Sequence, residues 1–99
     1  MNLIDYIERQ RQWSLKTFGD GRRTKGITSH IKKELQEIES NPTDVIEWID
    51  VVILALDGAW RSGHTAEEIV EGMQNKQGIN FKRIYPMPTS QDEASEHLK

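Results

Sequence analysis

The chain has 99 residues, of which 35% are hydrophobic and 29% are charged, and its formal net charge is -3. A chain of this size buries only about 60% of the surface that it exposes when unfolded, so we expect one small domain with a modest core. No apolar run approaches the roughly 20 residues of a membrane span. Cysteine does not occur, which excludes disulfides and thiolate metal sites. The negative charge disfavours binding to nucleic acid polymers, including through a helix-turn-helix. The first residues show no apolar h-region and no cleavage site, so we expect no signal peptide and a cytoplasmic protein.

Glycines and prolines divide the chain into four predicted helices. The first runs from Leu3 to about Lys16 and is followed by a loop around Gly19 and Gly21. The second begins near Thr28 and runs to about Ser40, where Asn41-Pro42 ends it.

Asn41 is the predicted cap of the third helix, which runs to about Arg61. Thr65 and Glu68 form a capping box that opens the fourth helix. This helix continues to about Arg83, with a weak point at Gly78, and prolines at 86 and 88 end the regular structure. We therefore predict one all-α domain over residues 1–99, with a core of about 1–85 and an irregular C-terminal arm over 86–99.

The third predicted helix combines an apolar surface with three acidic residues. Twelve of the sixteen residues in VIEWIDVVILALDGAW (45–60) are apolar, so the helix should be buried on most sides. At about 100° per residue, Glu47, Asp50 and Asp57 nevertheless fall on one narrow stripe. Buried carboxylates without partners are costly, so this stripe requires cations beside it.

The second predicted helix adds acids with the same spacing. Glu34 and Glu37 repeat the i, i+3 separation of Glu47 and Asp50, and His30 lies on their stripe. Two such pairs on antiparallel helices would bring four carboxylates together, which is the ligand set of Mg²⁺ or Mn²⁺. No Glu-x-x-His occurs, so a di-iron site is disfavoured. Each pair on its own also fits a solvated helix face.

The fourth predicted helix carries hydrogen-bond donors. Lys76, Asn80 and Arg83 lie within about 60° of one another. Donors that face a carboxylate-bound metal indicate a polyphosphate between them, although such a face is also common on plain surface. Lys33 and Arg61 are further candidates for the phosphates, and Arg61 could instead bind carbonyl groups.

The segments KELQEI, EWIDVVILALDGAWRSG and KQGINFKR resemble the MazG-like all-α nucleoside triphosphate pyrophosphohydrolases, whose signature is Glu-x-x-Glu, a turn, and Glu-x-x-Asp. The features TFGDG, HIKKELQEI, LALDGAWRSG and K-x-x-x-N-x-x-R narrow the resemblance to the dATP/dGTP pyrophosphohydrolases known from phages and bacteria. They span Thr17 to His97. The resemblance implies a four-helix MazG-like bundle that hydrolyses a purine deoxynucleoside triphosphate to the monophosphate and pyrophosphate.

The resemblance also implies roles for individual residues. Glu34, Glu37, Glu47 and Asp50 are the expected ligands of Mg²⁺, with more than one ion per site and Mn²⁺ as a substitute. Asp57 is either a further ligand or the partner of a basic side chain. Lys76, Asn80 and Arg83 match the polyphosphate-facing positions. We expect a metal-activated water to attack the α-phosphorus, with Glu34 or Glu37 as the catalytic base.

Base and sugar recognition must come from other residues. The candidates precede or adjoin the acidic helix, and they are Trp13, Thr17, Phe18, Gly19 and His30. Trp13 fits an ordinary core position equally well, and His97 in the arm could close over the phosphates. The base itself stays open between dGTP, dATP and another nucleotide.

A 99-residue chain cannot cover an apolar central helix alone. We therefore expect a homo-oligomer, a dimer or a dimer of dimers, in which Trp48, Val51, Leu54 or Trp60 partly face another copy. A non-catalytic helical homodimer that binds a basic partner is the alternative from a different functional class.

Overall fold

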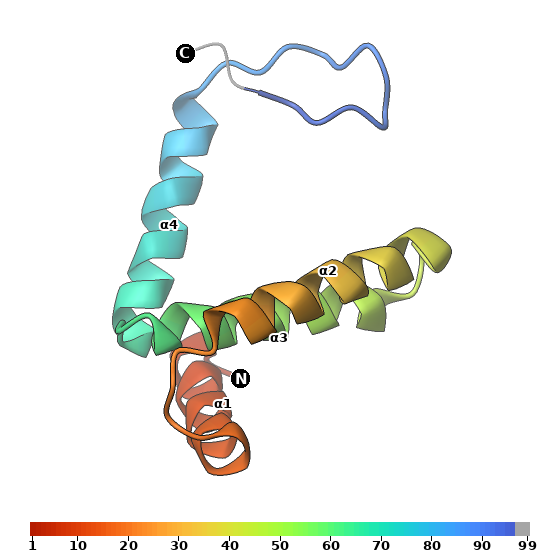
Figure 1. The fold of residues 1–99 in the computed structure, drawn as a ribbon. Coiled ribbons are helices and arrows are strands. Elements are labelled where there is room, and N and C mark those ends of the chain that lie inside the picture. The colour runs from red at the N-terminus through yellow and green to blue at the C-terminus, as the bar shows by residue number, and fades with distance from the viewer. Residues whose placement is uncertain (97–99) are drawn as a thin grey trace.

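The computed structural model describes residues 1–96, which form four α-helices and no strand (Figure 1). The helices are α1 (Leu3–Phe18), α2 (Thr24–Ser40), α3 (Val45–Arg61) and α4 (Ala66–Lys82). The prediction of an all-α fold is confirmed. Within the described residues, none of the helices is long and apolar enough to cross a membrane.

α2 begins four residues earlier than predicted. Thr28 is no cap, because its hydroxyl donates to the Lys25 carbonyl inside the helix. The residue before the helix is Arg23, which adopts a left-handed conformation (φ 54°) and makes no side-chain capping bond. The start of α2 therefore carries none of the side-chain signals by which a helix start is recognised in a sequence.

α3 also has a different cap from the one predicted. Asn41 ends α2, since its N–H donates to the carbonyls of Glu37 and Ile38. The side chain of Asp44 caps α3 by accepting from the N–H of Ile46 at 3.0 Å. The capping box of Thr65 and Glu68 at the start of α4 is confirmed, whereas α4 passes Gly78 without a break, so the predicted weak point was wrong.

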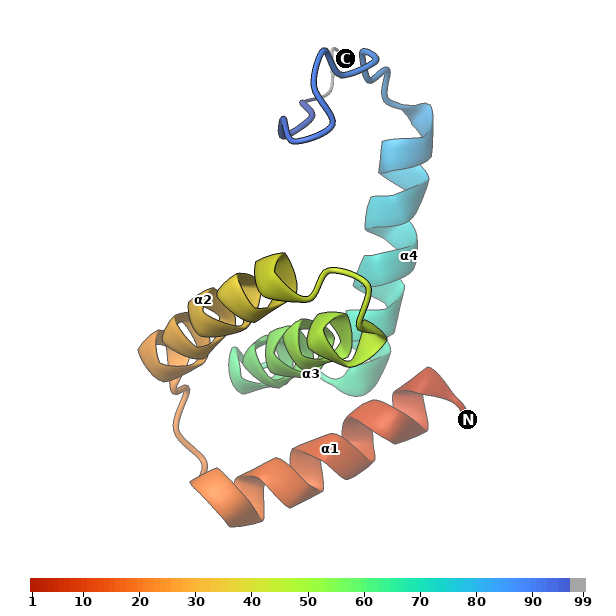
Figure 2. The same ribbon diagram turned by 90° about the vertical axis from the view of Figure 1, so that its right-hand side faces the viewer.

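α2 and α3 form an antiparallel pair, as both views show (Figures 1 and 2). Ile27 and Ile38 of α2 are buried. A Cβ atom at Gly58 of α3 would lie 3.7 Å from the Ile27 side chain, an ordinary van der Waals distance, so α2 and α3 pack directly against each other at this position. This pairing brings the acidic residues of both helices to one region.

The core lies where α1 crosses α3 and the start of α4 (Figure 2). Ile7, Leu56, Trp60 and Ala66 form its buried cluster. α1 also packs Ile4, Tyr6 and Leu15 against this cluster, whereas Trp13 is 59% exposed. Trp13 is therefore no core residue.

The outer face of α3 remains uncovered within one chain. Its exposed large apolar residues are Val45, Ile46, Trp48, Ile49 and Val52. Of the residues expected to face a second copy, Trp48 is exposed and Val51 and Leu54 are partly buried, but Trp60 belongs to the core. One chain therefore does not cover α3, as expected for a chain of this size with an apolar central helix.

α4 leads away from the α2–α3 pair, and the irregular segment continues beyond its end (Figures 1 and 2). The first half of α4 packs on α1 through Ile69 and Val70. His97, which could close over the phosphates, lies outside the described residues.

Candidate metal and nucleotide site

Three predicted ligands meet between α2 and α3. Glu34, Glu37 and Glu47 each offer a carboxylate oxygen, and these three oxygens lie within 4.8 Å of one another. Glu34 is buried, with 7% of its surface exposed, and the other two are partly buried. In the described part of the chain, no lysine or arginine forms an ion pair with any of the three. The cluster is therefore a concentration of negative charge that lacks its own counter-cation.

The acid–base properties of the cluster reflect this crowding. The pKa of Glu34 is raised by a hydrogen bond that its protonated form shares with Glu37, by burial, and by the charges of Glu37 and Asp50, although His30 opposes the shift. The pKa of Glu47 is raised by burial and by the neighbouring carboxylates, Glu37 above all. A divalent cation would remove this repulsion, and an all-oxygen set suits Mg²⁺ or Mn²⁺.

Asp50 lies at the margin of this cluster. Its charge acts on both Glu34 and Glu47, but it is not among the three residues whose oxygens converge. Asp50 and Glu34 line the same pocket. The structure thus brings three of the four predicted ligands together and places the fourth beside the adjoining pocket.

This pocket lies between α1, α2 and α3 and has a volume of about 300 Å³, the lower end of the range for small-molecule sites. Acidic side chains line part of it, and His30 lies among them with its Nε2 3.0 Å from Oε1 of Glu34. The other Glu34 carboxylate oxygen is buried without a hydrogen-bond partner. The pocket therefore adjoins the carboxylate cluster and shares a residue with it.

Aromatic side chains also line the pocket. Trp13 and Phe18 lie edge to face, with ring centroids 5.7 Å apart. The guanidinium of Arg23 lies 4.5 Å from the centroid of the Phe18 ring. Such a wall offers π-faces and a cation to a planar ligand.

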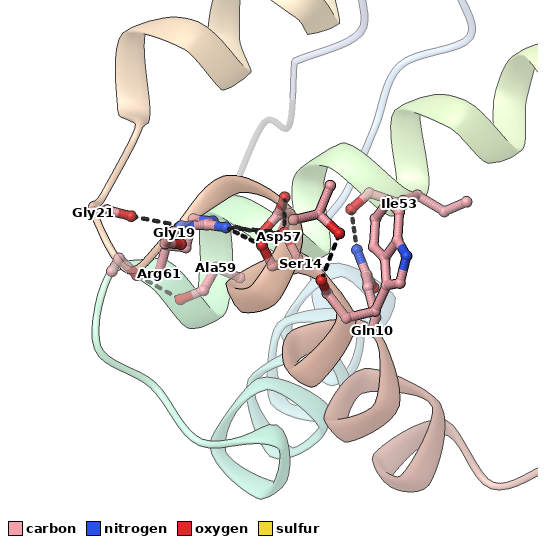
Figure 3. Close-up of polar contacts among 11 residues, drawn as sticks. Gln10, Ser14, Gly19, Gly21, Ile53, Asp57, Ala59 and Arg61 are labelled. Atoms are coloured by element: carbon pink, nitrogen blue, oxygen red, sulfur yellow. Dashed lines mark hydrogen bonds and ion pairs between the residues drawn. The ribbon is translucent and has the colours of Figure 1, made fainter.

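Asp57 and Arg61 of α3 form a buried ion pair, with 2.7 Å between Arg61 Nε and Asp57 Oδ1 (Figure 3). The hydroxyl of Ser14 donates to the same carboxylate. Arg61 also donates to the carbonyls of Gly19 and Gly21. Asp57 is thus the partner of a basic side chain, which was one of its two predicted roles. Arg61 binds carbonyl groups and has no donor left for a phosphate.

A family model described as dATP/dGTP pyrophosphohydrolase matches residues 6–99. The chain belongs to this family. No curated protein and no solved structure matches it. The family match spans α1 to the C-terminal arm, so it covers both the carboxylate cluster and the aromatic pocket of this pyrophosphohydrolase family member.

The predicted phosphate-binding residues lie apart from the carboxylates within one chain. Lys76, Asn80 and Arg83 occupy the second half of α4 and the residue after it. No contact joins α2 to α4 among the described residues, and α4 leads away from the pair that holds the acids (Figure 1). Arg83 and Asn80 instead contact each other, with 3.4 Å between Nη1 and Oδ1. The structure does not bring this donor face to the metal site of the same chain.

The other residues predicted to bind the nucleotide lie outside the pocket. Thr17 donates its hydroxyl to the Trp13 carbonyl, Gly19 ends α1 with its carbonyl bound to Arg61, and neither lines the pocket. Lys33 is exposed on α2.

Sequence reasoning missed the contributions of Gln10, Ser14 and Arg23. Gln10 lines the pocket and donates its amide to the Ile53 carbonyl at 2.8 Å. Ile7, Gln10 and Ser14 follow the i, i+3, i+7 spacing of one helix face, so two polar residues on a face with a buried isoleucine were the available signal. No comparable signal points to Arg23.

Proposed function

We propose that this protein hydrolyses purine deoxynucleoside triphosphates, dGTP or dATP, to the monophosphate and pyrophosphate in a metal-dependent reaction. The observation that carries the proposal is the convergence of three carboxylate oxygens beside an aromatic pocket, where no lysine or arginine of residues 1–96 pairs with them. The family's description as a dATP/dGTP pyrophosphohydrolase supports the choice of substrate. We place the activity in the cytoplasm, that of the host cell if a phage encodes the protein.

Glu34, Glu37 and Glu47 would hold Mg²⁺ or Mn²⁺, with Asp50 as the fourth ligand. The raised pKa values of Glu34 and Glu47 support this assignment, because they reflect repulsion that a bound cation relieves. Four carboxylates supply enough oxygen ligands for more than one ion beside a triphosphate. When bound, the metal neutralises phosphate oxygens and acidifies a water molecule.

The residues of the chain then act on that water and on the substrate. Glu37 or Glu34 accepts the proton as the water oxygen bonds to the α-phosphorus. The bond between the α-phosphorus and the bridging oxygen breaks, and pyrophosphate departs with the electron pair. His30, which contacts Glu34, would orient this carboxylate toward its ligand or contact the sugar.

The purine base would occupy the pocket beside the cluster. Trp13 and Phe18 supply apolar faces for a bicyclic base, and about 300 Å³ is enough to hold one. Because Glu34 lines the pocket, a nucleotide whose base lies there would have its phosphates near the carboxylate cluster. We propose guanine or adenine as the base that the pocket binds. The alternative within the same class of enzyme is a nucleoside triphosphate diphosphatase that prefers another base.

A second copy of the chain completes the site in this proposal. The exposed apolar face of α3 requires a cover, and the α4 donor face lies away from the carboxylates of its own chain. In a dimer, or a dimer of dimers, Lys76, Asn80 and Arg83 of one copy would serve the phosphates bound by another.

The assignment is tested with Glu47→Gln and a matched control, Glu39→Gln, which alters an exposed glutamate outside the cluster. With saturating Mg²⁺ and dGTP or dATP, we expect the first variant to lose about a hundredfold or more in kcat. The control should retain wild-type turnover. Full activity in Glu47→Gln would show that the assignment is wrong.

The exposed α3 face also favours the second candidate, a helical homodimeric interaction module without catalysis. Incubation with all eight common ribo- and deoxyribonucleoside triphosphates separates the two. Release of pyrophosphate supports the enzyme, whereas a Mg²⁺-dependent rise in Tm without turnover of any nucleotide supports the module.

A further inference from the structure

Arg61 uses every N–H donor of its guanidinium inside the protein. Nε bonds to Asp57, Nη1 bonds to the carbonyls of Gly19 and Gly21, and Nη2 bonds to the carbonyl and the hydroxyl of Ser14. These are five acceptors for five donors, at 2.7 to 3.3 Å. The side chain is 1% exposed, and its guanidinium also stacks 4.5 Å from the centroid of the Trp60 ring.

Two of these bonds hold the segment that joins α1 to α2. Gly19 and Gly21 direct their carbonyl groups toward Arg61, as Figure 3 shows. Gly19 has a positive φ of 86°, a conformation that favours glycine. The path of residues 19–21 is therefore fixed by a side chain of α3, although both glycines are exposed.

Both ends of this segment lead into the wall of the pocket. Phe18 precedes it and Arg23 follows it, and both side chains line the pocket. Arg23 adopts a left-handed backbone conformation (φ 54°) that a non-glycine residue adopts only when its surroundings impose it. The stack of Arg23 on Phe18 thus depends on where the segment runs.

Asp57 also connects Arg61 to the pocket. It lines the pocket, and its two oxygens accept the hydroxyl of Ser14 while Oδ1 also accepts from Arg61. Both carboxylate oxygens of Asp57 therefore bind groups of the protein itself, so we assign Asp57 to the support of the pocket and not to metal binding.

We infer that Arg61, fixed by Asp57 and Ser14, is a positioning residue that sets the Phe18–Arg23 wall of the pocket and thereby the affinity and selectivity for the nucleobase. The inference rests on the proposed function. In this inference Phe18 offers an aromatic face and Arg23 a cation, a combination that suits a planar, electron-rich purine. Arg61 acts through Phe18 and Arg23 and touches neither metal nor phosphate.

The test compares the wild type with Arg61→Lys, which keeps the charge but cannot form the five-donor fork. The matched control is Arg11→Lys, which alters an exposed arginine whose ion pair with Glu8 spans 3.6 Å. KM and kcat are measured for dGTP and dATP, together with inhibition by inorganic tripolyphosphate, a ligand without a base. Amide hydrogen exchange then reports on residues 18–23.

For Arg61→Lys we expect KM for the preferred nucleotide to rise about tenfold, because Phe18 and Arg23 are no longer held in position to contact the base. The ratio of kcat/KM between dGTP and dATP should move toward one, while kcat and inhibition by tripolyphosphate stay within about twofold of the wild type. Exchange of residues 18–23 should become faster. Arg11→Lys should match the wild type in every measurement.

Ser14→Ala keeps the ion pair and supplies the same test if Arg61→Lys does not fold. It should change KM and selectivity in the same direction by a smaller factor. Unchanged KM and selectivity in a folded variant, or a fall in kcat alone, would overturn the inference while leaving the proposed function intact. Absence of turnover in the wild type with every nucleotide would overturn both.

Discussion

The three converging glutamates destabilise the folded protein when no cation is bound. Glu34 has one carboxylate oxygen bound to His30 and the other buried without a partner. Glu37 and Glu47 add negative charge within 4.8 Å. The repulsion that raises the pKa values of Glu34 and Glu47 also lowers the stability of the fold at neutral pH. A bound cation would remove this repulsion and stabilise the folded state.

The raised pKa values predict how stability depends on pH. The folded state holds its protons to a higher pH than the unfolded chain, in which these glutamates titrate near the ordinary value of 4.5. Their ionisation therefore lowers the free energy of unfolding as the pH rises from about 4.5 through the raised pKa values. We expect Mg²⁺ to raise Tm at pH 7.5 and to have little effect near pH 4.5.

Glu47→Gln should raise the Tm of the metal-free protein at pH 7.5 and diminish the response to Mg²⁺, because it removes one of the repelling charges. Glu39→Gln should leave both unchanged. Differential scanning calorimetry with EDTA and with Mg²⁺ measures these changes. An equal Mg²⁺ response in Glu47→Gln and the wild type would contradict the metal assignment.

Among the helices, α4 depends most clearly on its own local interactions, since only its first half packs on the core. The capping box fixes its start: the Thr65 hydroxyl accepts from the Glu68 N–H, and the Glu68 carboxylate accepts from the Thr65 N–H. These bonds to Thr65 lower the pKa of Glu68, with a smaller contribution from His64.

Thr65→Ala should reduce the free energy of unfolding by about 1 kcal/mol at pH 7, the usual cost of a lost cap. The contribution of Glu68 is present above its ordinary pKa of 4.5 and is lost as the pH falls through its lowered pKa. The difference between variant and wild type should therefore shrink below about pH 4. Urea denaturation at several pH values tests this, and a difference that grows at low pH would contradict it.

Glycines in and beside the helices should respond oppositely to alanine. Gly72 lies inside α4 with open space where the Cβ atom of an alanine would lie, so Gly72→Ala should stabilise the protein by about 0.5–1 kcal/mol. Gly19 also has space, but its φ of 86° makes Gly19→Ala destabilising by about 1–3 kcal/mol. Equal effects of the two substitutions on urea denaturation would contradict the backbone argument.

For the molecule as a whole, local patterns predicted more than the packing of helices did. The i, i+3 acid pairs and the Pro turn predicted two antiparallel helices with facing carboxylates, and three of these acids do converge. Arg23 escaped prediction because its conformation follows from the contacts of the 19–21 segment with α3. The direction of α4 escaped because the turn at Gly63 and the packing on α1 decide it, and neither has a periodic signature.

The exposed face of α3 leads to a prediction about assembly. We expect the protein to have at least twice the mass of one chain by light scattering at micromolar concentration. Val52→Glu places a charge on this exposed face, where 50% of Val52 is accessible, and should yield monomers with unchanged helical circular dichroism. A monomeric wild type would contradict the shared site.

The most direct test of the account is hydrolysis of dGTP and dATP with Mg²⁺ in ¹⁸O-labelled water, followed by mass spectrometry of both products. We predict that the label enters the deoxynucleoside monophosphate and that pyrophosphate carries none, because water attacks the α-phosphorus. Glu47→Gln should form both products about a hundredfold or more slowly. Label in pyrophosphate, release of single phosphates, or no turnover by the wild type would contradict the account.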